Sequence, residues 1–238
     1  PVPYVHGEDG QGNVFLPPPT TKAIDKSAAQ FIIDTVMSNP GEITLVPVGP
    51  RGNPGLARRG EPRIAQIGKE VGRVGGTALG RGNAPPAAEA NILNDAEAAD
   101  VVFGAPWQVT MVGLDVTHEV KATKAHLDEY KKINNPMAQH IVRILPVYID
   151  FFESTYNTDG IFLHDSSALA YLIDPTLFTV VQSAVRVDTD SGISRGKTWP
   201  NLGERPRAPW EGRPKVNICV AVEGERLLEL ELERMRGD

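Results

Sequence analysis

Hydrophobic residues recur along this chain with two periods, which predict helices and strands in turn. Ala29, Ile32 and Val36 fall three or four positions apart, a spacing typical of one face of an amphipathic helix. This spacing predicts a helix over 21–37, which ends at the Asn-Pro-Gly sequence that follows. The apolar run at 43–48 comes next and predicts a short buried strand.

The same two patterns continue through the rest of the chain. Helical spacing predicts helices over 63–71, 95–103, 121–133, from Pro136 onward, over 169–173 and over 223–235. Apolar runs predict strands over 109–114, 178–187 and 216–222, with a hairpin turn at 188–192 and a returning strand at 193–199. Strands that alternate with helices favour an α/β fold. We therefore expect an open, mostly parallel sheet flanked by helices, in a single domain over 1–238.

Composition and charge exclude several classes of protein. The 238 residues include 24 Lys+Arg and 30 Asp+Glu, for a net charge of −6. An acidic chain is poorly suited to nucleic acid or to an anionic membrane surface. No apolar run approaches the ~20 residues that cross a bilayer. The single cysteine, Cys219, excludes an internal disulfide framework, so we expect a cytoplasmic protein with no nucleic-acid or membrane partner.

Polar side chains gather in two segments before the middle of the chain. His6 lies beside two carboxylates in the Gly-rich loop 5–12, which suits either a ligand contact or a surface turn. Asn83, Glu89 and Asn91 combine amides with a carboxylate, as the neighbouring hydroxyls of a polyol require. The same segment also suits a loop followed by a cap, with Asn91 or the nearby Asn94 capping the helix at 95–103.

Two further segments follow predicted strands, where ligands of open α/β sheets bind. Asp115 and His118 come after the strand at 109–114, and for Asp115 we favour a structural role in the turn. His164 and Asp165 follow an apolar run at the start of a helix. This pair suits a proton donor beside a ligand for a hard metal ion, or a satisfied histidine beside a helix cap.

We assign several other polar residues to no functional site. The arginines between positions 51 and 81 follow no helical stripe, so we interpret them as solvated charge. His126 and His140 lie on predicted charged or amphipathic helices and suggest no site.

The order and spacing of these segments together resemble the nucleoside hydrolases, the inosine-uridine preferring family. The resemblance extends over nearly the whole chain and rests on the segments 5–10, 40–50, 75–76, 82–91, 113–118 and 163–165. It implies an open α/β sheet around a calcium site. It also implies hydrolysis of the N-glycosidic bond of ribonucleosides such as inosine or uridine, giving the free base and ribose.

The resemblance implies a role for eight residues of this chain. Asp165 would be a calcium ligand and the backbone carbonyl of Gly52 another; Asn83, Glu89 and Asn91 would hold the ribose hydroxyls; His164 would face the leaving base; and His6 and Tyr156 would line the base pocket. Members of the family are commonly homo-oligomers, which implies a homodimer or homotetramer.

The chain also departs from the family pattern. Members open with a strand and an Asp-x-Asp-x-x-x-Asp-Asp motif, which supplies most calcium ligands and the general base. This sequence has no such motif, so we expect an N-terminal strand and acidic segment to be missing from it. Two alternatives stay open: a member that binds a nucleoside or ribosyl ligand without cleaving it, and an enzyme for another N-riboside.

Overall fold

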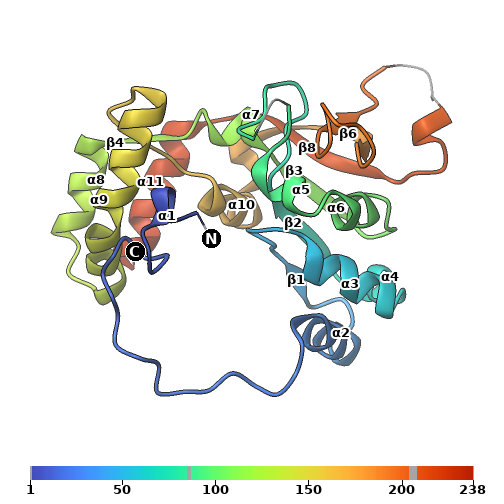
Figure 1. Cartoon of the computed structure of the whole chain (residues 1–238), viewed down its shortest axis with the longest axis horizontal. Helices are drawn as coiled ribbons and strands as arrows, with labels where there is room; N and C mark the ends of the chain where they lie inside the picture. Colours follow the sequence, from blue (N-terminus) through green and yellow to red (C-terminus); the bar gives the residue numbers. More distant parts are fainter. Residues whose placement is uncertain (1, 85–86, 204–207, 238) are drawn as a thin grey trace. The chain divides into compact units, whose positions relative to one another are not determined.

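A computed structural model describes residues 2–84, 87–203 and 208–237 (Figure 1). Their contacts divide the chain into two units. Unit 1 comprises 1–24, 119–163 and 223–238, and unit 2 comprises 25–118 and 164–222. Each unit contains a hydrophobic core of its own. The single domain expected from the sequence stays a prediction.

A mixed sheet lies at the centre of unit 2. Within the described residues its six strands run in the order β1 (Thr44–Leu45), β2 (Glu70–Val74), β3 (Val109–Val112), β8 (Lys215–Val222), β6 (Phe178–Val187) and β7 (Thr198–Pro200). From β1 to β8 each strand is parallel to its neighbour, whereas β6 pairs antiparallel with both β8 and β7. The expected open, mostly parallel sheet is therefore confirmed.

Helices connect and flank these strands. They are α2 (Ala28–Ser38), α3 (Gly52–Gly60), α4 (Ile64–Ile67), α5 (Ala90–Asn94), α6 (Ala96–Phe103), α7 (Leu114–Thr117) and α10 (Asp165–Ile173), with 3₁₀ turns at Pro175–Leu177 and Ala208–Trp210. Every residue of β3 is buried, and Phe103 of α6 belongs to the same core. Burial on both faces explains why the sequence of β3 is mostly apolar and does not alternate with polar residues.

Unit 1 is mainly helical. Its elements are α1 (Pro3–His6), β4 (Lys121–Thr123), α8 (Lys124–Lys132), α9 (Pro136–Tyr156), β5 (Gly160–Phe162) and α11 (Gly224–Arg236), with β4 and β5 paired antiparallel. Tyr130, Ile133, Ala138 and Leu232 form its core. Across the described parts of both units, no helix has the length and apolar character needed to span a membrane.

The helix predicted over 21–37 begins only at Ala28, after its N-cap residue Ser27. Two other predicted helices give way in part to strands. The helix predicted over 63–71 ends at Ile67, because Gly68 has an extended backbone. The chain then enters β2, which hydrogen-bonds with β1 and β3. The helix predicted over 121–133 begins only at Lys124, since the three preceding residues pair with β5. In both cases strand pairing overrides the helical spacing of the apolar residues.

The contact between α3 and α6 yields a stability prediction. A β-carbon on Gly55 would lie 2.7 Å from the β-carbon of Ala98, whereas one on Gly60 would meet only the flexible end of Ile33 at 3.4 Å. We expect Gly55→Ala to lower the free energy of unfolding by ~1–3 kcal/mol through overpacking. We expect Gly60→Ala, its matched control on the same helix, to raise it by up to ~1 kcal/mol through helix propensity. Urea denaturation measures both, and equal effects of the two substitutions would contradict the close packing.

Candidate active site

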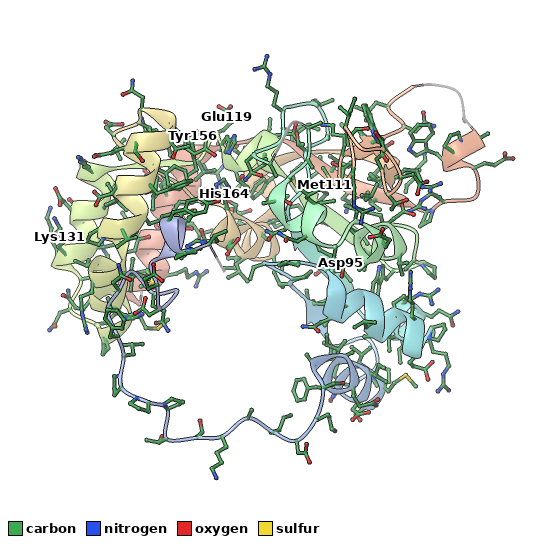
Figure 2. The ribbon with its side chains drawn as sticks, in the orientation of Figure 1. Asp95, Met111, Glu119, Lys131, Tyr156 and His164 are labelled. Carbon is green, nitrogen blue, oxygen red and sulfur yellow. The ribbon has the colours of Figure 1, made fainter. Side chains whose placement is uncertain are left out.

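His164 and Asp165 lie together at the start of α10, as Figure 2 shows for His164. His164 is the N-cap residue and Asp165 the first residue of the helix. Neither gives the helix a side-chain cap, so the alternative of Asp165 as a capping residue is wrong. Both residues therefore lie at the start of the helix, and neither side chain caps it.

The end of α7 fixes the ring of His164. A hydrogen bond of 2.7 Å joins the hydroxyl of Thr117 and Nδ1 of His164, and the tautomer of the ring decides which group donates. The ring of His118 meets that of His164 edge-on, with 5.4 Å between centroids. Burial, and secondly the charge of His118, lowers the pKa of His164 to about 4. The imidazole is therefore neutral at pH 7, and what it offers a ligand at that pH is a neutral N–H.

Glu89 is buried and is the N-cap residue of α5. Its Oε1 accepts a hydrogen bond from the backbone N–H of Asn91 at 2.8 Å. Its Oε2 accepts from those of Gly76 at 3.0 Å and Ile92 at 3.1 Å. Each of the two carboxylate oxygens keeps further acceptor capacity beside these three backbone donors.

The two asparagines of this segment also bind backbone. Oδ1 of Asn83 accepts a hydrogen bond from the N–H of Ala90 at 2.9 Å, and Nδ2 of Asn91 donates to the carbonyl of Val48 at 3.4 Å. The cap predicted from Asn91 or Asn94 is wrong, because Asp95 caps α6 with its own side chain. Asn83, Glu89 and Asn91 thus shape one loop at the start of α5.

Arg51 contradicts its interpretation as solvated charge. Its side chain is fully buried, and its Nη1 donates a 2.6 Å hydrogen bond to the carbonyl of Gly49. A β-carbon on Gly75 would lie 2.4 Å from Oε2 of Glu89 and 2.7 Å from Nη2 of Arg51. The guanidinium and the carboxylate therefore both lie against that glycine. Burial lowers the pKa of Arg51 to about 10, and the charges of Glu89 and Asp165 oppose the shift.

Asp165 belongs to the same electrostatic group. The residue as a whole is exposed, yet its carboxyl is crowded enough that desolvation raises its pKa to about 6. The negative charge of Glu89 adds to the rise, and the positive charge of Arg51 opposes it. Three charged side chains from separate segments of unit 2 therefore act on one another.

Gly52, the other residue expected to bind calcium, opens α3. In the part of the chain that the structure describes, no group of three or more His, Cys, Asp or Glu could hold a metal ion. The charges of Glu89 and Asp165 act on the buried guanidinium of Arg51. The residues present do not by themselves fit a calcium site, because this ion takes six to eight oxygen ligands.

Asp115 has the structural role that we favoured. Its carboxylate accepts backbone hydrogen bonds from Ala78 at 2.6 Å, Leu79 at 2.9 Å and Gly80 at 2.8 Å. The ammonium of Lys197 donates to the carbonyl of Gly80 at 2.9 Å. These contacts fix the loop that follows β2, and they assign Asp115 no part in binding a ligand.

The two residues expected to line the base pocket lie in unit 1. The exposed ring of His6 stacks on Tyr148, with 5.5 Å between centroids. Tyr156, the last residue of α9, stacks on Phe152 at 5.2 Å. Both are thus supported by aromatic packing within their own unit, and their part in a base pocket stays a prediction.

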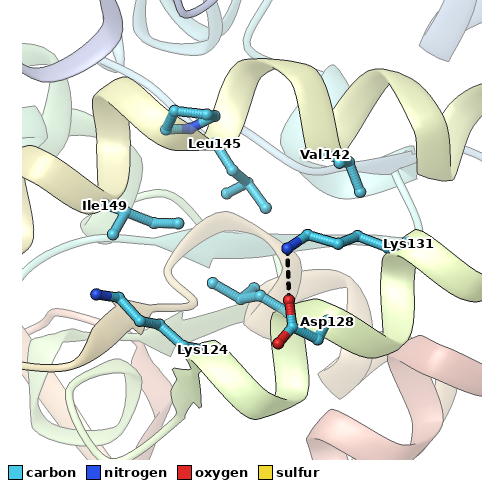
Figure 3. Close-up of a pocket in the computed structure, with 8 residues that line it drawn as sticks. Lys124, Asp128, Lys131, Val142, Leu145 and Ile149 are labelled. Carbon is cyan, nitrogen blue, oxygen red and sulfur yellow. Dashed lines mark hydrogen bonds and ion pairs between the residues drawn. The ribbon is translucent and has the colours of Figure 1, made fainter.

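A cavity of about 360 Å³ lies between α8 and α9 of unit 1 (Figure 3). Leu127, Val142, Leu145 and Ile149 supply its apolar lining, and Lys124 lies at its edge. None of the residues that the sequence singled out for a site lines this cavity.

Comparison with known proteins identifies the family. A profile of the inosine-uridine preferring nucleoside hydrolases matches residues 1–229. A probable uridine nucleosidase 2 of Arabidopsis thaliana is 37% identical over 98% of this chain and 73% of its own length. An inosine-uridine preferring nucleoside hydrolase of Leishmania major is 42% identical over 82% of this chain and 62% of its own.

The fold agrees with these sequence matches. The solved structure of a plant nucleoside hydrolase superposes with a TM-score of 0.94 at 34% identity, covering 99% of this chain and 74% of that one. Sequence and fold together place the chain in the inosine-uridine preferring nucleoside hydrolase family.

Proposed function

We propose that this chain hydrolyses the N-glycosidic bond of ribonucleosides, releasing the free base and ribose. Membership of the family supports the reaction class. The observation that carries the proposal is that the carboxylate of Asp165, which follows His164 at the start of α10, interacts electrostatically with that of Glu89. These groups offer negative charge for the sugar and a hydrogen-bond donor for the base.

The carboxylates suit the charge that develops during the reaction. Breaking the bond builds positive, oxocarbenium-like character on the ribose, which nearby carboxylates stabilise. Glu89 keeps acceptor capacity for a ribose hydroxyl, since its oxygens are hydrogen-bonded to only three N–H groups. Asn83 precedes it in the chain, Asn91 lies in the first turn of α5, and both are assigned to the remaining ribose hydroxyls.

His164 is assigned to the departing base. Negative charge develops on the nitrogen of the departing base, and a hydrogen-bond donor directed at that nitrogen stabilises it. With the hydroxyl of Thr117 donating to Nδ1, the ring proton of neutral His164 lies on Nε2. His6 and Tyr156 complete the assignment as residues of the base pocket.

The names of the relatives bear on which nucleosides are substrates. The relatives are named for uridine alone and for inosine together with uridine. We therefore propose nucleosides of both types as substrates. We also propose that the protein works in the cytoplasm as a homodimer or homotetramer.

Calcium dependence is the part of the resemblance that the described residues support least. Asp165 and the carbonyl of Gly52 are the ligands that the resemblance assigns. These two oxygen donors do not complete the shell of six to eight oxygens that calcium takes. Calcium binding stays a prediction, and the assignments of His164 and Glu89 do not depend on it.

A second candidate function is binding of a nucleoside without cleavage. The observation that favours it concerns the carboxylates that could act as general base and activate a water molecule. Glu89 caps α5, and the positive charge of Arg51 acts on Asp165, so other groups of the protein already interact with both carboxylates. In this candidate the site holds ribose and base, and the glycosidic bond stays intact.

The role of His164 gives a leaving-group prediction. We expect His164→Ala to lower turnover of inosine and uridine by ~10–100-fold, because it removes a hydrogen bond to the charged departing base, and such a bond is worth ~1.5–3 kcal/mol. Turnover of 4-nitrophenyl riboside should change far less, since nitrophenolate leaves without a proton. Ribose release and nitrophenolate absorbance measure the two reactions, with His140→Ala on α9 as the control. An equal loss on both substrates would remove His164 from this role, and no ribose release by the unmodified chain would favour the binding candidate.

The surroundings of His164 give a pH prediction. NMR titration of the folded protein should place its imidazole midpoint near pH 4, and His118→Gln should raise the midpoint but leave it below 6.5. Between pH 6.5 and 4 the folded state then binds fewer protons at this residue than the unfolded state. Its contribution to the free energy of unfolding therefore falls as the pH is lowered through that interval. A midpoint at or above 6.5 in the unmodified protein would contradict the burial of the ring.

A further inference from the structure

We propose that Arg51 is the resident cation of this site, whose guanidinium balances the carboxylates of Glu89 and Asp165 in place of a bound metal ion. The inference rests on the proposed function only in taking these residues as the site. It concerns the affinity of Asp165 for a divalent cation, and its test measures cation binding and not turnover.

The first support is the burial of the charge. Arg51 is fully buried, and among the residues that the structure describes its Nε and Nη2 have no hydrogen-bond partner. Its one hydrogen bond there is the one from Nη1 to the neutral carbonyl of Gly49. Arginine stays charged in proteins, and a buried charge is tolerated only when opposite charge compensates it.

The second support is the position of that opposite charge. Oε2 of Glu89 and Nη2 of Arg51 both crowd the open face of Gly75, where a side chain would clash with both. The charge of Asp165 acts on Arg51 as well. Arg51 also directly precedes Gly52, whose carbonyl is the second ligand that the resemblance assigns to calcium.

The consequence concerns metal affinity. A divalent cation bound by Asp165 would lie near a guanidinium of the same sign, and like charges repel strongly where water is scarce. Removing the guanidinium would leave two carboxylates without a counterion. Arg51 should therefore set the affinity of Asp165 for calcium.

The test compares Arg51→Met with Arg59→Met. Both remove one positive charge from the same stretch of chain, but Arg59 is exposed. Calorimetric titration with Ca²⁺ should show ~10-fold or greater gain in affinity for Arg51→Met, and no gain for Arg59→Met. Adding Asp165→Asn to Arg51→Met should abolish the gain. Equal affinities of Arg51→Met and the unmodified chain, or a gain that survives Asp165→Asn, would overturn the proposal.

A second measurement keeps the proposal testable if Arg51→Met does not fold. The melting temperatures of the unmodified protein and of Asp165→Asn are recorded with and without millimolar Ca²⁺. We expect calcium to change the two proteins equally, because Arg51 keeps the ion from Asp165. A calcium-induced rise that Asp165→Asn removes would overturn the proposal. Failure of the proposed function would appear separately, as absent ribose release with these cation results unchanged.

Discussion

A buried guanidinium must be compensated by the groups around it, and much of the site follows from this requirement at Arg51. Glu89 supplies one compensating charge while its oxygens also cap α5. Both side chains lie so close to Gly75 that a side chain at that position would clash with them. Asp165 joins the same group from the start of α10, next to His164. One charge cluster thus ties the loop after β2 to the starts of α3, α5 and α10.

Family membership and local geometry bear on different questions. The match over residues 1–229 and the superposition on a plant nucleoside hydrolase establish the fold and the family. The geometry bears on how this chain would act. His164 is neutral at pH 7, so it can offer a leaving base a hydrogen bond from a neutral imidazole N–H. The charge of a buried arginine acts on both carboxylates, so the charge balance of this site involves a side chain of the protein itself.

Much of the fold could be predicted from the sequence, because burial leaves a strong local pattern. The strand predicted over 178–187 coincides with β6, and the helix over 95–103 differs from α6 by one residue. The exceptions lie where local signals are weak. The Gly- and Pro-rich residues of α3 predicted no helix. The apolar spacing across 63–71 concealed the change from α4 to β2, which pairing with neighbouring strands decides.

The site was partly predictable for a related reason. The position of His164 and Asp165 at a helix start follows from the apolar run before them, and the polar loop around Glu89 stands out in composition. The burial of Arg51 could not be read from periodicity, since it depends on distant loops around Gly75 and Glu89. The one available signal was its place directly after a strand and a Gly-Pro turn, at the sheet edge where ligands bind.

The proposed ribonucleoside site consists of Glu89, His164 and Asp165. A crystal structure of the chain with a slowly hydrolysed inosine analogue tests this most directly. We expect ribose hydroxyls within ~2.7–3.2 Å of the carboxylate of Glu89, with the base towards His164. Ribose bound away from both residues, for example in the cavity between α8 and α9, would contradict it.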